Sequence, residues 1–251
     1  SLATPEEQRQ WMRTRLQPYR VEPLGGAAAN GGDGLLTSYF EPLYEATRQP
    51  RPGFGVPIYR PPPTLAQRKP WYTRQEMDML PEARTQLAGQ EIGYLADPVD
   101  ALILQIQGSG RVRVSEPDGS QRTVRLAFAG TNEQPYRSPG AWLMAQGDIK
   151  DATWPGIKAW LAANPQRVQE FLWSNPRMVF FREEPLSPLD LQFGPKGAQG
   201  VALTPGRSIA VDPQSIPYGT PVWLSSQGPV ANLQRLVMAQ DTGSAIVGAV
   251  R

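Results

Sequence analysis

The stretch LVMAQDTGSAIVG, Leu236–Gly248, decides how this sequence is interpreted. A run of mostly apolar residues that favour a strand ends in Asp241, and turn-forming Thr, Gly and Ser follow it. The same arrangement stands earlier, where Ser208–Val211 reads SIAV and is followed by Asp212 and a proline. We therefore expect two strands, each of which ends in an aspartate and holds it rigidly at the start of a loop.

The tetrapeptide Asp-Thr-Gly-Ser also surrounds the catalytic carboxylate of pepsin-like aspartic proteases. Those enzymes need two carboxylates that share one proton, so a single chain must supply a second Asp-Thr-Gly or Asp-Ser-Gly. This chain has none, which argues against a protease. A simpler alternative stays open at this point, because aspartates commonly cap turns, and both Asp212 and Asp241 could be turn residues only.

The composition excludes several kinds of chemistry. The chain of 251 residues contains no cysteine and no histidine, so it has no thiol nucleophile, no disulfide, no Cys/His zinc site and no histidine-dependent triad. Acid–base chemistry must therefore use Asp, Glu, Tyr or Lys. We expect neither a metal nor an organic cofactor, although the lack of Cys and His does not exclude an ion held by oxygen atoms. The net charge of +2 is mild and spread along the chain, so a nucleic acid is not an expected partner. Arginine side chains would suit a substrate that bears carboxylates.

The order of expected elements predicts the architecture. Pro5–Leu16 favours a helix, and the 27 prolines and 24 glycines spaced along the chain favour many short strands joined by turns. Alternating apolar residues predict a strand over Asp100–Gly110, then a hairpin over 111–130. A short helix is expected over 138–147, and two more, broken at Asn164-Pro165, over 154–176, before strands return. A mixed block between two β-rich regions is typical of a β-barrel interrupted by an inserted domain.

Two further features suggest a binding surface, and each has an ordinary alternative. Gln107-Gly108-Ser109-Gly110 would let a ligand approach the backbone closely, although it could equally be a hairpin corner. Tyr39, Phe40 and Tyr136 lie near turn residues and could stack on sugar rings, although aromatic residues more often pack in a core.

Taken together, the ordered motifs resemble the membrane-bound lytic murein transglycosylase A family of bacterial cell-wall enzymes. The motifs are LLTSYFEPLYEAT, LILQIQGSGRV, AFAGTNEQPYRSPGAWL, NPRMVFF, LTPGRSIAVDPQSIPYGTPVWL and LVMAQDTGSAIVG, and the resemblance runs from Gly34 to the last residue. It implies a mainly β fold. A double-psi β-barrel domain, residues 1–40 and 193–251, would be interrupted by a smaller β-rich (α+β) domain, residues 41–192, with a glycan groove between them.

The resemblance also implies an activity. Family members cleave the β-1,4 bond between N-acetylmuramic acid and N-acetylglucosamine in peptidoglycan and close a 1,6-anhydro ring instead of adding water. Ordinary glycosidases need two carboxylates. Here the C6 hydroxyl of the sugar is the nucleophile, so one protein carboxyl suffices. Asp212 and Asp241 match the first two of three family aspartates. The third, the acid/base, is expected past Arg251, so this chain by itself is expected to be inactive.

The resemblance implies a set of binding residues and a location. The expected substrate-binding residues are Thr37, Ser38, Tyr39, Phe40, Gln107, Gly108, Ser109, Gly110, Tyr136, Arg137 and Gly243, with Arg137 placed to bind a peptide or lactyl carboxylate. The expected partner is the glycan strand of peptidoglycan. The family is tethered as a lipoprotein to the periplasmic side of the outer membrane by an N-terminal lipid anchor. This chain has no cysteine to carry one, and we expect the signal and anchor to have been removed.

Two alternatives to a lytic enzyme stay open. A non-catalytic peptidoglycan-binding module would use the same groove without an acid. An inverting endoglucanase on a similar barrel would need two acids about 6.5–9.5 Å apart, for which Asp212 and Asp241 could nominally serve.

Overall fold

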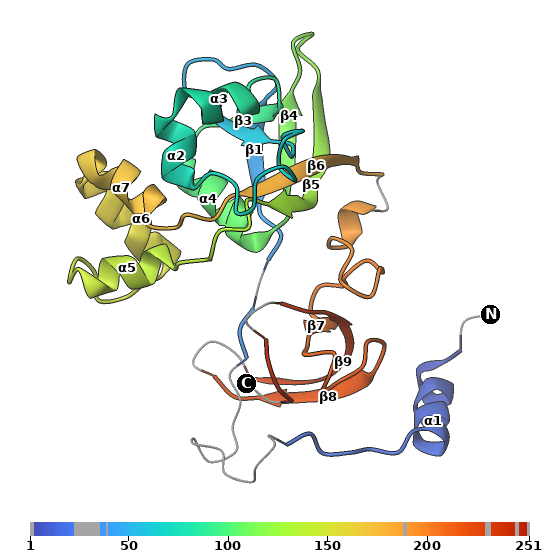
Figure 1. Cartoon of the computed structure of the whole chain (residues 1–251). Coiled ribbons are helices and arrows are strands. Elements are labelled where there is room, and N and C mark those ends of the chain that lie inside the picture. Colours follow the sequence, from blue (N-terminus) through green and yellow to red (C-terminus); the bar gives the residue numbers. More distant parts are fainter. Residues whose placement is uncertain are drawn as a thin grey trace. The chain divides into compact units, whose positions relative to one another are not determined.

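The computed structural model describes residues 3–22, 36–38, 40–187, 190–228, 232–243 and 246–249. The chain divides into two compact units (Figure 1). Unit 1 consists of Ser1–Ser38 and Lys196–Arg251, and unit 2 is Tyr39–Pro195. Each unit has a β-sheet of its own.

Unit 2 is built on a six-stranded sheet in the order β2-β3-β1-β4-β5-β6. Its strands are β1 (Leu43–Thr47), β2 (Val56–Tyr59), β3 (Glu91–Leu95), β4 (Gly110–Ser115), β5 (Gln121–Thr131) and β6 (Val179–Pro185). β1 and β4 are parallel, and the other neighbours are antiparallel. The edge strands β2 and β6 also contact each other without forming a ladder, so the sheet is a nearly closed barrel with one open seam.

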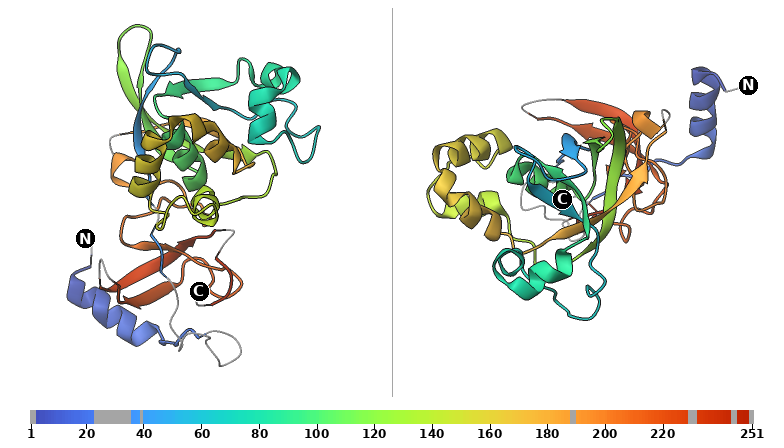
Figure 2. Two further views of the ribbon diagram at one scale, coloured as in Figure 1. Left: turned by 90° about the vertical axis from the view of Figure 1, so that its left-hand side faces the viewer. Right: turned by 90° about the horizontal axis from the view of Figure 1, so that it is seen from above.

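The helices of unit 2 lie beside its sheet, and α4 packs between the sheet and the three helices that come later in the chain. In the described ranges they are α2 (Arg74–Met79), α3 (Pro81–Leu87), α4 (Pro98–Gln107), α5 (Pro139–Ala145), α6 (Trp154–Ala163) and α7 (Val168–Trp173), with a short 3₁₀ turn at Pro165–Arg167. The expected start of α5 is confirmed, because the Ser138 hydroxyl accepts the Ala141 N–H and Pro139 takes the first helical position. α5, α6 and α7 gather beside α4 (Figure 2), where their apolar residues share one core.

The strand predicted over Asp100–Gly110 is wrong, because this segment forms helix α4. The Asp97 carboxylate caps the helix by accepting the Val99 N–H, and Gly108 ends it in the left-handed conformation at φ 78°. Leu104 packs into the core of the sheet, while Leu102 packs among α5, α6 and α7. A helix buried on opposite sides is apolar at nearly every position, so the apparent alternation did not distinguish a strand from a helix.

Gly110, at the start of β4, has no room for a side chain. A methyl group there would collide with the Cδ1 atom of buried Leu104 and lie 3.1 Å from the Cγ atom of Pro42. We therefore expect Gly110→Ala to lower the free energy of unfolding by about 1–3 kcal/mol, the usual cost of overpacking. Urea unfolding monitored by tryptophan fluorescence measures this. Gly55→Ala is the matched control, since nothing lies within 4 Å of its added methyl group. Equal stability of the two variants would contradict the prediction.

A charged cluster joins the two ends of unit 2. Arg111 and Arg125 both form ion pairs with Glu41, at 2.7 and 2.6 Å, and both donate to the carbonyl of Phe193. The side chains of Glu41 and Arg125 are only 10% and 8% exposed. We call this group, Glu41 with Arg111, Arg125 and the Phe193 carbonyl, the clamp, because it fastens the segment that enters unit 2 to the one that leaves it.

Unit 1 contains a helix and a three-stranded sheet. Helix α1 (Pro5–Arg15) confirms the expected N-terminal helix and begins with a capping box between Thr4 and Glu7. The strands are β7 (Ser208–Ala210), β8 (Pro221–Ser226) and β9 (Leu233–Asp241), in the order β7-β9-β8. β7 and β9 are parallel, and β8 is antiparallel to β9. The expected fold class, mainly β with an inserted α+β part, is confirmed. In the described ranges, no helix is both long and apolar enough to cross a lipid bilayer.

Candidate functional site

The structure brings Asp212 and Asp241 to the same end of two neighbouring strands. β7 and β9 run parallel, and Ala210 is in register with Asp241. The Val211 N–H donates to the Asp241 carbonyl at 2.9 Å, so Asp212 follows β7 at the point where Asp241 ends β9. The carboxyl ends of parallel strands are a common place for functional side chains, because the sheet fixes the backbone and the loops are free to vary.

A backbone donor orients the carboxylate of Asp241. Its Oδ1 atom accepts the Ala198 N–H at 2.9 Å, from a loop that runs beside the end of β9. In the same loop the Gln199 N–H donates to the Gln240 carbonyl at 3.1 Å. Gly197 leaves no space for a Cβ atom, which would collide with that carbonyl. The close approach of this loop therefore depends on a glycine and places an N–H group against Asp241.

Asp212 is held as an anion. Its Oδ1 atom accepts the Gln214 N–H at 3.0 Å, and its Oδ2 atom accepts the Gly248 N–H at 2.7 Å. These two hydrogen bonds, with that from Gly248 the stronger, lower the pKa of Asp212 below its ordinary value, because N–H donors stabilise the charged carboxylate. An aspartate of this kind suits orientation or electrostatic stabilisation, and it is poorly suited to donate a proton.

The segment after β9 leads from one aspartate to the other. The Ile246 N–H donates to the Gly243 carbonyl at 2.8 Å, and Gly248, at φ 87°, brings its own N–H to Asp212. Left-handed backbone of this kind favours glycine. Gly243 is half-buried, and Ser244 of the Asp-Thr-Gly-Ser motif lies outside the described residues.

The other expected binding residues are distributed over both units. Thr37 and Ser38 are exposed in unit 1, and Phe40, Tyr136 and Arg137 are exposed in unit 2. Tyr39 lies outside the described residues. A groove that these residues form together stays a prediction.

The Gln107–Gly110 segment connects a helix to a strand, so the hairpin corner that was considered for it is not formed. Gln107 ends α4, Gly108 is its C-terminal cap, and Gly110 is buried at the start of β4. Gln107, Gly108 and Ser109 are half-buried. Helix capping accounts for Gly108 and close packing for Gly110, and a role of this segment in binding stays a prediction.

Two buried asparagines that sequence reasoning missed support the loop carrying Tyr136 and Arg137. The Asn132 side chain donates to the carbonyls of Tyr72 and Pro176 and accepts the Met178 N–H. The Asn175 side chain accepts the Arg137 N–H at 3.3 Å. The NEQPYRS and SNPRM motifs contain these residues, but no local pattern shows that they meet. The hydrogen bonds of the two asparagines thus hold the loop in place. Within the described ranges, no carboxylate pairs with Arg137.

Metal-binding side chains do not cluster in the part of the chain that the structure describes. No group of three or more His, Cys, Asp or Glu residues there could hold a metal ion. The described part of the site offers two oriented carboxylates and the backbone N–H groups around them.

These features define a class of protein, in which a β unit carries paired aspartates at the ends of parallel strands and an α+β unit interrupts its sequence. Family models match both parts. Residues 35–182 match the MltA specific insert domain, and residues 207–251 match the 3D domain. The chain belongs to the membrane-bound lytic murein transglycosylase A (MltA) family.

Individual relatives agree with this assignment. The membrane-bound lytic murein transglycosylase A of Vibrio cholerae is 31% identical, over 96% of this chain and 66% of its own length. The solved structure of the lytic transglycosylase LtgG of Burkholderia pseudomallei is 46% identical, with a TM-score of 0.64 over 88% of this chain and 65% of that one. Escherichia coli MltA with bound chitohexaose is 30% identical, with a TM-score of 0.73 over 89% and 65%. The chain thus spans just under two thirds of the length of these relatives.

Proposed function

We propose that the protein is a lytic transglycosylase that cleaves the β-1,4 bond between N-acetylmuramic acid and N-acetylglucosamine in peptidoglycan and forms 1,6-anhydromuramic acid. Family membership and the names of the relatives support the reaction. The chitohexaose bound to one solved relative supports a glycan strand as the substrate. The observation that carries the proposal for this chain is the pair Asp212 and Asp241 at one end of β7 and β9.

In the proposed mechanism the two aspartates assist a third. The acid/base would be the third aspartate of the family pattern, past Arg251, which protonates the leaving oxygen and then takes the proton from the C6 hydroxyl. The hydrogen bond from Gly248 to Asp212 supports this arrangement, because it holds the last described part of the chain beside Asp212. The negative charge of Asp241 would help to keep the acid protonated and would stabilise positive charge at the anomeric carbon.

Digestion of murein sacculi by the full-length protein tests the reaction. We expect mass spectrometry of the released muropeptides to show 1,6-anhydro ends. Reducing ends instead would mean hydrolysis, as expected of an endoglucanase-like enzyme. Saturable binding of glycan strands without any cleavage would favour a non-catalytic binding module.

Arg137 is proposed to bind a carboxylate that is attached to the glycan strand. Its side chain is exposed on a loop that buried asparagines hold, and a guanidinium binds a carboxylate through charge-assisted hydrogen bonds. We expect Arg137→Ala to weaken binding of peptide-bearing strands about tenfold or more, the scale of one such bond. Isothermal titration calorimetry measures this, and chito-oligosaccharides, which carry no carboxylate, should bind the variant as before. Unchanged affinity for the peptide-bearing strands would contradict this role.

The proposed location is the periplasmic side of the outer membrane, reached through an N-terminal lipid anchor in the full-length protein. The relatives are named membrane-bound murein enzymes, which supports a place in the cell envelope. Fractionation of cells that express the full-length protein tests this, and recovery in the cytoplasmic fraction would argue against it.

A further inference from the structure

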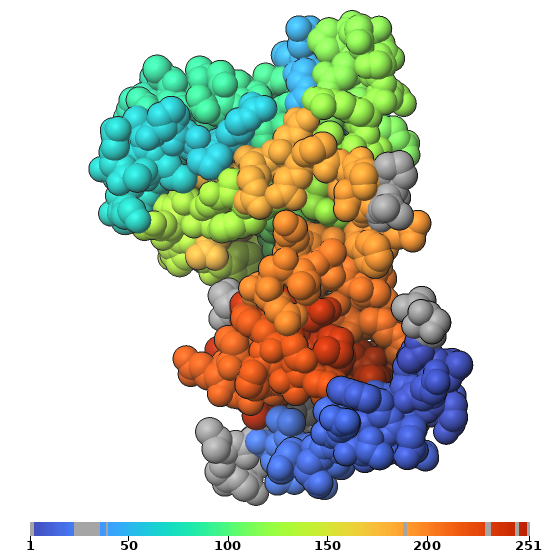
Figure 3. Space-filling view, turned by 90° about the vertical axis from the view of Figure 1, so that its right-hand side faces the viewer, coloured from blue at the N-terminus to red at the C-terminus, as the bar shows by residue number. Residues whose placement is uncertain are grey.

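A cleft with a volume of about 540 Å³ lies in unit 2, whereas the aspartate pair belongs to unit 1. It is lined by Arg48, Arg60, Arg122, Arg182, Glu183 and Pro185. These residues come from the ends of β1 and β2 and from β5 and β6, so the cleft lies along the seam where the edge strands β2 and β6 meet without a ladder. In Figure 3 the orange region of β6 is exposed beside the green hairpin of β4 and β5.

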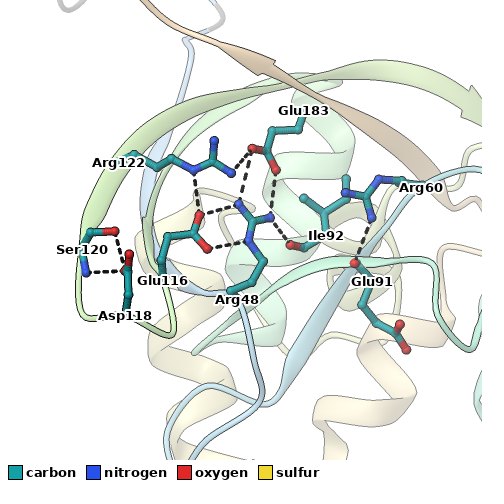
Figure 4. Close-up of polar contacts among 9 residues, drawn as sticks. All are labelled: Arg48, Arg60, Glu91, Ile92, Glu116, Asp118, Ser120, Arg122 and Glu183. Atoms are coloured by element: carbon teal, nitrogen blue, oxygen red, sulfur yellow. Dashed lines mark hydrogen bonds and ion pairs between the residues drawn. The ribbon is translucent and has the colours of Figure 1, made fainter.

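One wall of the cleft is a closed network of ion pairs (Figure 4). Arg48 donates to both oxygens of Glu116, at 2.8 and 3.1 Å, to Glu183 at 2.9 Å and to the Ile92 carbonyl at 2.6 Å. Arg122 bridges the same two carboxylates at 2.7 and 2.9 Å. Hydrogen bonds from Arg48 and Arg122 lower the pKa of Glu116 to about 2. Because Arg48 has its donors occupied, it forms rigid structure and is not free to bind a ligand.

The remaining arginines differ in how far they are engaged. Arg182 donates to Glu184 and to the Phe128 carbonyl. Arg60 is exposed, and in the described ranges its guanidinium donates only to the Glu91 carbonyl at 3.1 Å. Figure 4 shows that the Glu91 carboxylate points away from it. Arg60 is therefore a cation on the wall of the cleft with no carboxylate partner among the described residues.

The charges around the cleft leave room for one more negative charge. The lining contains four guanidinium groups, and three of them pair with carboxylates in the described chain, those of Glu116, Glu183 and Glu184. One positive charge is left over, which matches a monoanion. A doubly charged phosphate would face Glu183 in the same wall, whereas a planar carboxylate fits side-on against a guanidinium.

We propose that this cleft is a second binding site, which takes the C-terminal carboxylate of a short peptide on Arg60. The volume lies in the range of small-ligand sites and exceeds what a lone anion needs. β2 and β6 are the outermost strands of the sheet, and edge strands are where an extended peptide is added in other proteins. Under the function proposed above, such peptides would be stem peptides of peptidoglycan that end in a free carboxylate. Only this naming of the peptide rests on the proposed function.

Titration of the 251-residue chain with a blocked dipeptide that ends in a free carboxylate tests the site, with isothermal titration calorimetry as the readout. We expect saturable binding by the wild type and at least tenfold weaker binding by Arg60→Ala and Arg60→Glu. Both variants should fold, because the side chain of Arg60 is held at the surface by the Glu91 carbonyl alone within the described ranges, and their thermal midpoints check this. Arg113→Ala is the matched control, because Arg113 is likewise an exposed arginine of the same unit and pairs with Glu45 outside the cleft.

The other arms decide between ligands. The same dipeptide with an amidated C-terminus should not bind, and inorganic phosphate should bind more weakly than the free acid. Binding of the amide, tighter binding of phosphate, equal affinity of the wild type and the Arg60 variants, or no saturable binding would each overturn the proposal. Because no cleavage is measured, failure here is distinct from failure of the lytic reaction.

Discussion

Asp241→Asn in the full-length protein is expected to lower the rate of anhydromuropeptide formation about 10²-fold or more, the usual scale for a positioned acid–base or electrostatic group. The substitution removes charge and keeps shape. The Oδ1 atom of an asparagine can still accept the Ala198 N–H that orients Asp241, and the backbone bond from Val211 does not involve the side chain. Stability should therefore change little. The measurement is the rate of product release from sacculi at fixed enzyme concentration, with the thermal midpoint determined in parallel.

Asp118→Asn is a matched control for this experiment. Asp118 also accepts a backbone N–H through Oδ1, from Ser120 at 2.9 Å, but it does so in the turn between β4 and β5 of unit 2. Its substitution should leave the rate unchanged. Near-full activity in a stable Asp241→Asn variant would mean that Asp241 serves only as a turn residue, and the proposed electrostatic role would be lost.

Glu41→Ala is expected to lower the free energy of unfolding by about 3–5 kcal/mol, the usual cost of removing one partner from a buried ion pair. The clamp places a single carboxylate between Arg111 and Arg125. Without it, two neighbouring guanidinium groups would share only backbone carbonyls, and Arg125, which is 8% exposed, could not recover its hydration. Urea unfolding measures the loss.

Glu45→Ala provides the comparison, because Glu45 lies four residues after Glu41 in the sequence, in β1. Glu45 pairs with Arg113 at 2.7 Å, but the two side chains are 53% and 45% exposed. Exposed pairs contribute about 0–1 kcal/mol, because water screens them and long side chains lose entropy. If Glu41→Ala and Glu45→Ala lowered the free energy of unfolding by similar amounts, burial of the clamp would not contribute to stability.

Much of the fold could be predicted because its signals are local. Ser138-Pro139 marks the start of α5, and Asp118-Gly119 lies in the turn of the hairpin, each through a backbone preference that acts over a few residues. Helix α4 could not be predicted in this way. Its residues are apolar because the sheet packs on one side and three helices pack on the other, and both contacts involve distant parts of the chain.

The site shows the same division. Asp212 and Asp241 could be singled out because each stands at the end of an apolar run, and the structure places the ends of β7 and β9 next to each other. The support of the 132–138 loop by Asn175 could not be foreseen, since the two are brought together only by the fold. The arginines of the seam were also missed, because each belongs to a different part of the sequence and none forms a motif.

The clamp affects how a chain with an inserted domain can evolve. The first and last segments of unit 2 meet at the same two guanidinium groups, so the residues between them leave and return at one place. If those residues were lost or exchanged, a short linker could join the two remaining ends without a change in the path of the chain in unit 1. Neighbouring ends of this kind are the condition under which one domain is tolerated inside another. The inserted domain is in this sense an exchangeable part, free to vary in length and surface while the aspartate-bearing sheet stays as it is.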